Sequence, residues 1–474
     1  MLKVRLPDNI FRAYDIRGIV YEGVDEEVGA GLDEGIIQLI GQAIASEALD
    51  LGEKSLIVSA DARLSSPAFP DAMIKGILST GCNVVNIGVG PTPLMYFATH
   101  HLDVHSGVMI TGSHNPKNYN GVKIVLSNNC LAADQITRLK ERILREDFHK
   151  GRGSSSILDI APDYIKTVRQ NIQLKKSHKV VIDCGNAVAG NCASQLFAAL
   201  GCQVVPLYCE TDGNFPNHHP DPTREENLQD LIALTNKENA ALGIAFDGDG
   251  DRVVLVSNSG KIIDADKMML TFIEDIVPEN PGASIIFDVK SSQHLSRTIS
   301  RLVGKPVMCK SGHSFVKQQM HATGALLGGE YSAHIFFRHR WYGFDDGMYS
   351  AARFLEIMDK NNRSADTLLE TCPITYSTAE LYVPGSEEEK FSIMDALLEK
   401  LEIPGAHIKR LDGIRAETEN AWGLIRASNT TPNLILRFEA DSASALEQIQ
   451  VVFRQAIMAF FPTLELNFPV PAQD

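Results

Sequence analysis

The chain has 474 residues, which at about 150 residues per domain predicts roughly three domains. Hydrophobic residues make up 44% and charged residues 22%, as is usual for globular proteins, and this composition argues against disorder, collagen and coiled coil. The 59 acidic and 44 basic residues give a net charge of −15, which disfavours nucleic acid as a partner and requires a local basic pocket for any anionic substrate.

The sequence shows no apolar stretch after the charges of its N-terminus and no run of about 18 apolar residues. We therefore expect a cytoplasmic protein that does not associate with membranes. The eight cysteines are dispersed, without a C-x-x-C pair, so buried free thiols are expected rather than a zinc knuckle or a disulfide scaffold. Heptads and an exposed apolar stripe are also missing, which leaves a monomer or a weak homo-oligomer open.

Near the N-terminus, residues 11–18 read Phe-Arg-Ala-Tyr-Asp-Ile-Arg-Gly. One interpretation is a surface strand with salt bridges. In the other, Arg17 belongs to a basic patch that would bind a dianionic phosphate ester, because cations in a partly dry cleft are screened far less than surface cations. The other members of this patch would be Lys123, Arg252, Lys290 and Arg426.

A β-α-β pattern occurs three times: an apolar run, a polar turn, a helical pattern, a glycine and a second apolar run. In each unit an aspartate, Asp61, Asp183 or Asp288, stands at or just after the end of the first strand. The strand, helix and strand of the units cover 55–59, 67–80 and 84–89, then 179–183, 193–200 and 204–208, and finally 283–288, 293–303 and 306–309. The pattern predicts three related α/β domains; the alternative is coincidence, because β-α-β units are common in unrelated chains.

After the first unit, the apolar residues 108–110 lead into Thr-Gly-Ser-His-Asn-Pro at 111–116, followed by Asn-Gly-Val-Lys at 120–123. Ser113 in a short loop after a strand is well placed for phosphoryl chemistry, but a free hydroxyl needs a base, a metal or prior modification. His114 is adjacent, and neighbouring residues rarely point at each other, so we assign it a supporting role. Taken alone, the loop could be an ordinary turn.

After the second unit, the sequence Asp-Gly-Asp-Gly-Asp-Arg at 247–252 lies between two apolar runs. Carboxylate oxygens are the ligands that Mg²⁺ prefers, and the glycines allow a tight turn that can direct Asp247, Asp249 and Asp251 at one ion. An EF-hand loop is excluded, because its sixth and twelfth positions would hold Arg252 and Asn258 rather than Gly and Glu. A solvated acidic turn leaves the alternating glycines unexplained.

The third unit is followed by Ser-Gly-His-Ser at 311–314 and Gly-Gly-Glu-Tyr-Ser-Ala-His at 328–334. Glu330 and Ser332 could bind vicinal sugar hydroxyls, which need donors and acceptors together. His313 is a possible proton carrier, because its reference pKa lies near neutrality. A polar turn and a structural histidine are the alternatives.

From about Thr371 the pattern changes to short strands near 379–383 and 434–440 and helices near 387–400 and 442–460, which predicts a smaller α+β domain. The segment Arg-Ala-Ser-Asn-Thr-Thr-Pro at 426–432 could form a phosphate cradle, with the arginine supplying a bidentate fork. Asn429 also starts a glycosylation sequon, which is the rival interpretation for a secreted protein, and a plain turn is the third.

Together these motifs resemble those of the α-D-phosphohexomutase superfamily, and most closely its bacterial phosphomannomutase/phosphoglucomutase group. The resemblance spans nearly the whole chain and rests on YDIRG, TGSHNP with NGVK, DGDGDR, GEYSAH and RASNTTPNL, in the family order. It implies an α/β fold with mixed sheets, in which three related α/β domains and a smaller α+β C-terminal domain surround a central cleft. We place the domains at 1–155, 156–258, 259–372 and 373–474.

The resemblance also implies roles for individual residues. Ser113 would be the phosphoserine and, with the three aspartates of 247–251, a Mg²⁺ ligand, and Arg252 would position the transferring phosphate. Glu330 and Ser332 would bind the sugar hydroxyls. The non-reacting phosphate would be bound by Arg426, Ser428, Asn429 and Thr430. Lys123, His313 and Arg17 would assist proton and charge movement, Tyr14 and Lys290 would line the same cleft, and the identity of the general base stays open.

The implied reaction is the reversible interconversion of hexose 1-phosphate and hexose 6-phosphate, of mannose, glucose or both. It would run through the enzyme phosphoserine and a hexose 1,6-bisphosphate, which also acts as activator, with Mg²⁺ as cofactor. The fourth domain could rotate to close over each substrate pose. Tyr331 and Ala333 stand where the group usually has Met and Gly, which leaves the preference among sugars open.

Three alternatives remain at this point. A phosphoglucosamine mutase shares the serine and metal motifs but usually has Asp-Gly where this chain has Tyr14 and Asp15. A non-catalytic sugar-phosphate binding protein would not need the serine together with all three aspartates. A metal-dependent phosphatase would release free phosphate.

Overall fold

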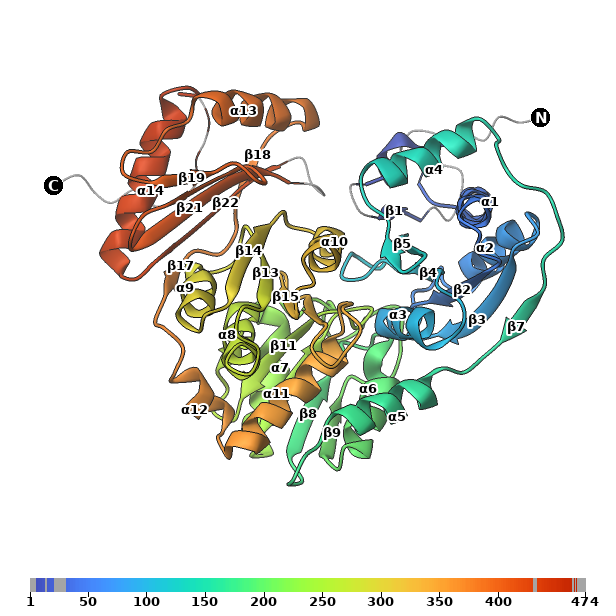
Figure 1. Cartoon of the computed structure of the whole chain (residues 1–474), viewed down its shortest axis with the longest axis horizontal. Helices are drawn as coiled ribbons and strands as arrows, with labels where there is room; N and C mark the ends of the chain where they lie inside the picture. The colour runs from blue at the N-terminus through green and yellow to red at the C-terminus, as the bar shows by residue number, and fades with distance from the viewer. Residues whose placement is uncertain are drawn as a thin grey trace.

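The computed structural model describes residues 6–12, 15–20, 31–428, 433–462, 464 and 466. Four sheets follow one another in chain order, each within its own domain. Figure 1 shows the four domains arranged round an arc, with the first domain at one end and the fourth at the other. No helix among the described residues is long and apolar enough to cross a membrane.

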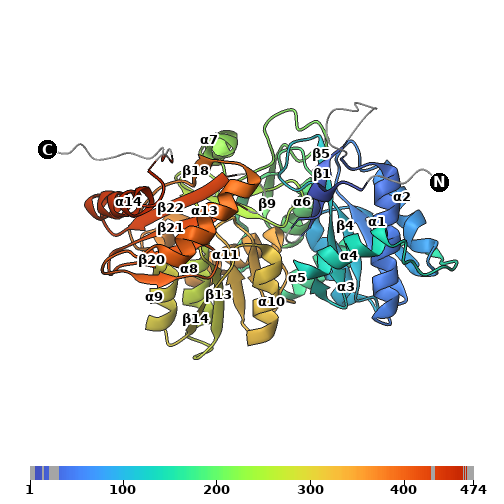
Figure 2. The same cartoon turned by 90° about the horizontal axis from the view of Figure 1, so that it is seen from above.

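The first domain contains a mixed sheet in the order β1-β5-β4-β2-β3-β7, with β6 paired to β5. Helices α1, α2 and α4 lie together on one side of it, as Figure 2 shows, and α3 packs on β2 and β4. Its elements are the 3₁₀ helix Asp8–Ile10, β1 (Ile16–Ile19), α1 (Glu34–Asp50), β2 (Ser55–Ala60), α2 (Ala68–Leu78), β3 (Asn83–Val89), α3 (Thr92–His101), β4 (Gly107–Ile110), β5 (Tyr119–Leu126), β6 (Asn129–Cys130), α4 (Asp134–Leu144) and β7 (Ser155–Ile157).

The second and third domains contain sheets in the orders β12-β11-β10-β8-β9 and β14-β13-β15-β16. The second comprises α5 (Ala161–Asn171), β8 (Lys179–Asp183), α6 (Ala189–Ala199), β9 (Gln203–Leu207), the 3₁₀ helix Glu225–Leu228, α7 (Gln229–Lys237), β10 (Leu242–Phe246), β11 (Val253–Ser257) and β12 (Ile262–Ile263). The third comprises α8 (Ala265–Ile276), β13 (Ser284–Asp288), α9 (Gln293–Arg301), β14 (Lys305–Cys309), α10 (His313–Thr323), β15 (Leu327–Gly329), β16 (Ile335–Phe337), α11 (Gly347–Asn361) and α12 (Ala365–Leu369).

The three α/β domains share one strand arrangement, which confirms the predicted repeat. In each, the first strand of the β-α-β unit lies between two parallel neighbours, and the second of these continues into an antiparallel strand. The corresponding sets are β3-β2-β4-β5, β9-β8-β10-β11 and β14-β13-β15-β16. The turns β4–β5, β10–β11 and β15–β16 therefore occupy the same place in three copies of one framework.

Helix positions follow the apolar pattern, with one informative exception. In α4 the buried Ile136, Leu139 and Ile143 recur at spacings of three and four residues, as expected for a helix with one face on a sheet. The helix predicted to start at residue 193 starts at Ala189 instead. A side chain at Gly190 would overlap the carbonyl of Cys209, so this end of α6 is fixed by a tertiary contact that helix propensity does not report.

The fourth domain is the predicted α+β unit, with a six-stranded sheet in place of the two strands that we predicted. The additional strands are short or alternate in polarity, and this gives a weak sequence signal. The elements are β17 (Tyr376–Ser377), β18 (Leu381–Pro384), α13 (Glu387–Lys400), β19 (His407–Lys409), β20 (Ile414–Glu417), β21 (Ala421–Ala427), β22 (Asn433–Ala440) and α14 (Ala443–Met458).

The apolar cores divide the chain unevenly. One continuous core joins α3 of the first domain to the second and third domains, with Phe97, Phe197 and Phe272 all buried in it. The fourth domain has a core of its own. The predicted boundary after residue 155 falls within β7, which pairs with β3 at the edge of the first sheet.

The contact between the third and fourth domains is largely polar. The Arg415 guanidinium donates to the carbonyls of Val289 and Ser291, both at 2.7 Å. Glu439 accepts from the Ser292 hydroxyl at 2.8 Å and from the Trp422 indole at 3.0 Å. A small apolar cluster of Val289, Met308, Trp422 and Leu424 spans the same boundary. The paired polar groups and this cluster together give the fourth domain a specific docked position.

Candidate active site

Three loops converge where the first three domains meet, and each is the turn that follows the same strand of the repeated framework. They are 111–118 between β4 and β5, 247–252 between β10 and β11, and 330–334 between β15 and β16. The carboxyl ends of parallel strands gather at one edge of a sheet. Residues that are more than two hundred positions apart in the sequence therefore face one another.

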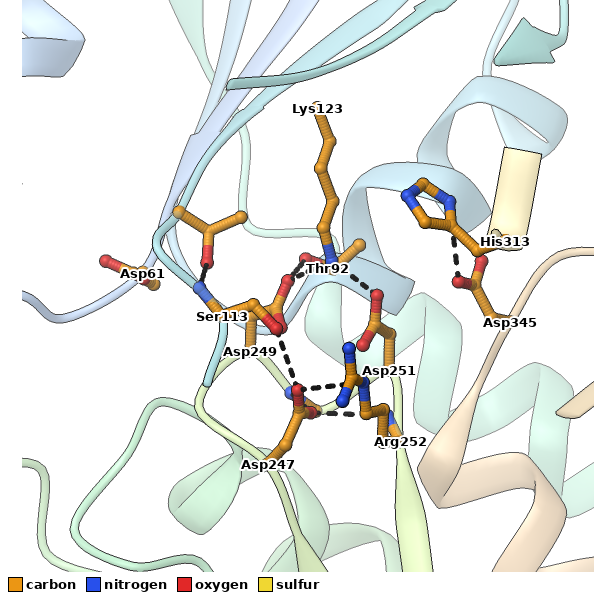
Figure 3. Close-up of polar contacts among 12 residues, drawn as sticks. Asp61, Thr92, Ser113, Lys123, Asp247, Asp249, Asp251, Arg252, His313 and Asp345 are labelled. Carbon is orange, nitrogen blue, oxygen red and sulfur yellow. Dashed lines mark hydrogen bonds and ion pairs between the residues drawn. The ribbon is translucent and has the colours of Figure 1, made fainter. Parts of the chain in front are cut away.

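Ser113 is 2% exposed and lies at the turn of the first loop. Its φ is +47°, a left-handed conformation that a residue with a side chain adopts at a cost. Its hydroxyl donates to Asp247 Oδ2 at 2.9 Å and lies 3.2 Å from His114 Nδ1. Figure 3 shows the Ser113 side chain directed from the first domain toward the aspartates of the second.

The three aspartates are fully buried, and their ligand oxygens lie within 4.8 Å of one another. The two glycines between them serve different purposes. Gly250 has φ +75°, and a side chain at Gly248 would overlap the carbonyl of Ser113. The alternating glycines therefore bend the turn and allow the serine loop to approach it closely.

Lys123 of β5 crosses from the first domain to this cluster. Its Nζ lies 2.6 Å from Asp249 Oδ2 and 2.5 Å from Asp251 Oδ2, as Figure 3 shows. The Thr92 hydroxyl, at the start of α3, donates to the same oxygen of Asp249. Burial lowers the pKa of Lys123, but the two carboxylates outweigh it and raise the pKa above its usual value, so the ammonium stays charged.

The cluster fits a hard divalent cation. Burial and the charges of Asp249 and Asp251 raise the pKa of Asp247 well above its usual value, and a cation between the carboxylates would relieve that repulsion. The Oδ1 atoms of Asp249 and Asp251 are buried and have no hydrogen-bond partner within the described part of the chain. Lys123 thus occupies one oxygen of each carboxylate, and the other is available as a ligand.

His334, the last residue of the third loop, contacts Arg252, Asp251 and Asp345 but received no role from the sequence. Arg252 Nε donates to His334 Nε2 at 3.0 Å. The imidazole proton therefore lies on Nδ1, which is 3.0 Å from Asp345 Oδ2 and 3.6 Å from Asp251 Oδ1. Arg252 also lies 3.8 Å from Asp247. His334 is part of the quoted GEYSAH motif, so the motif itself was the available signal.

His313 begins α10 and lies beside the same acid, with Nδ1 3.9 Å from Asp345 Oδ2. Lys317, one turn further along α10, binds Asp345 Oδ1 at 2.8 Å and the Tyr96 hydroxyl at 2.9 Å. Burial and the Lys317 charge lower the pKa of His313 well below its usual value, so the imidazole is neutral. No sequence motif singled out Asp345 or Lys317.

Glu330 is buried behind the start of α10. Its Oε1 accepts from the Gly312 backbone N–H at 2.6 Å, while Oε2 is buried without a hydrogen-bond partner among the described residues. Burial raises the pKa of Glu330 despite the neighbouring His334. Ser332 is half-buried in the same turn. The free oxygen of Glu330 is an acceptor that a sugar hydroxyl could satisfy.

Two of the predicted phosphate-binding residues of the fourth domain, Arg426 and Ser428, are among the described residues. Arg426 of β21 binds Asp412 at 3.0 Å, and Asp412 accepts from the backbone N–H of Ser311 at 3.1 Å. Ser428 is buried, and its carbonyl accepts from the Lys390 ammonium at 2.8 Å. The bond between Asp412 and Ser311 connects the fourth domain to the segment just before α10.

Two further predicted residues, Lys290 and Arg17, are among the described residues. Lys290 binds Glu380 at 3.1 Å, between the third and fourth domains. Arg17 donates to the Asn115 side chain at 2.6 Å and binds Asp15 at 2.7 Å, so it contacts the serine loop from β1. Tyr14, Asn429 and Thr430 lie outside the described residues.

Comparison with known proteins agrees with this arrangement. Four models of phosphoglucomutase/phosphomannomutase domains match in order: α/β/α domain I at 8–150, domain II at 162–260, domain III at 264–376 and the C-terminal domain at 380–456. A phosphomannomutase/phosphoglucomutase of Pseudomonas aeruginosa is 50% identical over 98% of both chains. A phosphoglucomutase of Neisseria meningitidis is 43% identical over 95% of this chain and 96% of its own. The crystal structure of a phosphoglucomutase/phosphomannomutase family protein from Burkholderia thailandensis, 42% identical, has a TM-score of 0.92 and covers 98% of this chain and all (100%) of its own.

Proposed function

Because this chain belongs to the phosphoglucomutase/phosphomannomutase family, we propose that Ser113 carries the phosphate in a reversible interconversion of hexose 1-phosphate and hexose 6-phosphate. The protein is an enzyme of the phosphomannomutase/phosphoglucomutase type, a hexose phosphate mutase. One observation carries the assignment of the carrier. The Ser113 hydroxyl bonds to Asp247 across a domain boundary, beside a buried carboxylate cluster that Lys123 partly neutralises.

Phosphoryl transfer needs alignment and charge neutralisation more than covalent participation by side chains. In the forward half-reaction, the bond between phosphorus and the serine oxygen breaks as a bond to the free sugar hydroxyl forms, and that hydroxyl loses its proton to a base. Lys123 and Arg252 offset the negative charge near the transferring group. The resulting hexose 1,6-bisphosphate then reorients, and its other phosphate returns to Ser113.

The cation would be held by the three aspartates of 247–251 and an oxygen of the phosphorylated serine, and we propose Mg²⁺ because all the protein donors are hard oxygens. Bound there, it would supply charge stabilisation to the phosphoryl oxygens.

Substrate recognition falls to residues away from the phosphoryl group. Glu330 and Ser332 would bind sugar hydroxyls, and Arg426 and Ser428 would bind the phosphate that is not reacting, with Tyr14, Lys290, Asn429 and Thr430 completing the site. Two opposite poses of one sugar can share such a site, because each pose presents one phosphate to Ser113 and one to the fourth domain. Mannose and glucose phosphates are the proposed substrates.

The first experiment follows both hexose phosphate isomers and free phosphate in one assay, with glucose 1-phosphate and mannose 1-phosphate as separate substrates. Interconversion supports the proposal. Unchanged isomers would indicate a binding protein, and free phosphate would indicate a phosphatase. Glucosamine 1-phosphate in a parallel assay tests the phosphoglucosamine alternative, which is favoured if it is turned over faster than both hexoses.

The second experiment tests the carrier itself. Ser113→Ala should remove nearly all turnover but still unfold cooperatively, with a midpoint lowered only by the loss of the hydrogen bond to Asp247. Intact-mass spectrometry should detect one phosphate on the wild-type protein after incubation with glucose 1,6-bisphosphate and none on the variant. Near-normal turnover by the variant would remove Ser113 from the mechanism.

We also propose that the enzyme acts in the cytoplasm, as a monomer or a weak homo-oligomer. All eight cysteines, each among the described residues, are free thiols, which is usual in a reducing compartment. Light scattering at several protein concentrations would measure the oligomeric state.

A further inference from the structure

A buried arginine that belongs to none of the motifs described above binds the backbone of the serine loop, residues 111–118. Arg63 lies in the turn after β2 and is 2% exposed. All five N–H groups of its guanidinium are paired. Nε donates to Asp61 Oδ2 at 3.2 Å. The other four donate to carbonyls of the serine loop: Ser113 at 2.6 Å, Asn115 at 2.7 Å, Pro116 at 2.6 Å and Tyr119 at 2.9 Å.

These bonds determine where Ser113 can lie. The guanidinium contacts both arms of the loop, and one of its donors binds the carbonyl of Ser113 itself, whose φ is +47°. A side chain at Gly112 would overlap the Arg63 guanidinium, so the glycine permits this close contact. A strained residue keeps such a conformation only where its surroundings over-determine it. In this loop, Arg63 supplies four hydrogen bonds to backbone carbonyls, one of them at Ser113 itself.

Arg63 is itself fixed from two sides. Asp61 binds its Nε, and the same carboxylate accepts from the Gly112 backbone N–H at 3.1 Å and from the Ser66 hydroxyl at 2.8 Å. On the opposite side, the ring of Phe215 from the second domain lies 5.5 Å from the guanidinium carbon. Arg63 thus connects the end of β2, the serine loop and a loop of the neighbouring domain.

We propose that Arg63 is a positioning residue for phosphoryl transfer: its guanidinium fixes the backbone of the serine loop so that Ser113 faces the carboxylate cluster. The inference rests on the proposed role of Ser113 as the phosphate carrier. A planar fork with five donors can bind four carbonyls and a carboxylate at once. A lysine ammonium has three donors and cannot reproduce this arrangement.

The test compares Arg63→Met and Arg63→Lys with a matched control, Arg353→Met. Arg353 is also fully buried, but in α11, where it binds Asp275 and the His339 carbonyl, away from the serine loop. For each protein we would measure the unfolding midpoint, kcat and KM for glucose 1-phosphate, and the rate at which Ser113 gains phosphate from glucose 1,6-bisphosphate.

We expect Arg63→Met to lower kcat and the phosphorylation rate of Ser113 by about 100-fold, because a displacement of about 1 Å at the reacting group has effects of that size. The KM should change by less than about threefold, because the loop backbone does not bind the sugar. Arg63→Lys should fall between Arg63→Met and the wild type. Free guanidinium at low millimolar concentration should restore part of the activity of Arg63→Met and none in the Arg353→Met control.

The wild-type protein in the same assays separates the two levels of inference. If it neither converts substrate nor gains phosphate on Ser113, the proposed function itself is wrong. If it does both, two results overturn the role of Arg63: wild-type kcat in a folded Arg63→Met protein, or equal losses in Arg63→Met and Arg353→Met. If Arg63→Met does not fold, Arg63→Lys decides by the same criteria. If neither folds, Arg63 serves stability alone and the positioning role is rejected.

Discussion

The two oxygens of each aspartate in the 247–251 turn have different partners. Lys123 binds one oxygen of Asp249 and one of Asp251, while their other oxygens have no hydrogen-bond partner among the described residues, although His334 lies 3.6 Å from that of Asp251. Hard cations prefer such buried, charged oxygens. The lysine and the proposed Mg²⁺ are therefore complementary, since each neutralises charge that the other leaves.

We expect Asp249→Asn to weaken Mg²⁺ binding by about 10- to 100-fold, the range found when the surroundings of a metal are altered. The amide keeps an acceptor oxygen but removes one negative charge from the cluster. Isothermal titration of the protein with Mg²⁺ measures the affinity directly, without turnover. Asp103→Asn, at a fully exposed side chain, is the control. Equal affinities in both variants would contradict the ligand assignment.

Glu330→Ala should lower kcat/KM by roughly one to two decades for glucose and mannose phosphates alike, because losing a hydrogen bond to substrate costs about 1 to 3 kcal/mol. We assign the sugar hydroxyls that Glu330 would bind to O3 and O4, away from C2, where the two sugars differ. Phosphorylation of Ser113 by glucose 1,6-bisphosphate should be impaired less. A loss confined to one sugar would show that Glu330 recognises C2.

Site residues that belong to a short motif could be predicted from the sequence. Residues whose role depends on contacts made only in the folded protein could not. Ser113 and the three aspartates stand in short loops of unusual composition next to apolar strands, and the structure brings them into contact. Arg63 and Asp345 have no local signal. The four carbonyls that Arg63 binds are 50 or more positions away in the sequence. Asp345 binds Lys317 and His334, which come from other elements of the third domain. Only the closed three-dimensional arrangement makes them neighbours of the site.

At the scale of elements, the three site loops occupy equivalent positions in the three α/β domains. The β-α-β pattern was visible in sequence because its strands are apolar and its helices amphipathic. The antiparallel strand that follows each unit was harder to predict from the sequence than the unit itself. The turn that leads into this strand forms each of the three site loops. The repeated aspartate has a related use in two copies: Asp61 binds the backbone N–H of Gly112, and Asp288 binds that of Tyr331.

The close approach of two of these turns gives a prediction. Gly248→Ala should lower kcat by about 100-fold, because the added methyl group would displace the Ser113 carbonyl and with it the reacting group. The variant should also lose about 1 to 3 kcal/mol of stability, because the methyl group would overlap a backbone atom in a buried turn. Steady-state assays would measure kcat, and thermal unfolding would measure the stability. Gly35→Ala, in α1 with only the Asp33 carboxylate nearby, is the matched control and should keep normal kcat.

At the scale of the whole molecule, the fourth domain is docked by polar contacts, a small apolar cluster around Trp422 and one buried acid. Asp266 of α8 accepts from the Ser292 backbone N–H at 3.1 Å and lies 3.8 Å from Arg437 of β22. Burial raises the pKa of Asp266 to about 8, against the opposing charge of Arg437. The ordinary value for an unfolded aspartate is about 3.9.

This difference predicts a pH dependence of stability. Between about pH 4 and 8 the unfolded chain gives up the Asp266 proton while the folded protein retains it, so the contribution of Asp266 to stability falls as pH rises and is lost above about 8. Asp266→Asn cannot titrate and should gain stability relative to the wild type between pH 6 and pH 8.5. Calorimetry at the two pH values measures this gain. Asp395→Asn, at an exposed position of α13, should show none.

The number of domains could be predicted from the motifs but not from the length of the chain. Length alone predicted about three domains, whereas the motifs, through their family resemblance, predicted four. Which domains share a core could not be predicted, because the contact of α3 with the second and third domains depends on how complete units pack. The independent core of the fourth domain is consistent with the proposed rotation of that domain.

The position of the serine on one domain and its carboxylates on the next has a consequence for a divided chain. If the mostly exposed segment 145–154 were cut, one fragment would contain Ser113 and Lys123 and the other all three aspartates. Each fragment alone would be inactive. Separating α3 from the second and third domains would also expose apolar surface on both fragments. Turnover would return only when the fragments reassemble. Enzyme activity would therefore be a direct measure of the association of two polypeptides.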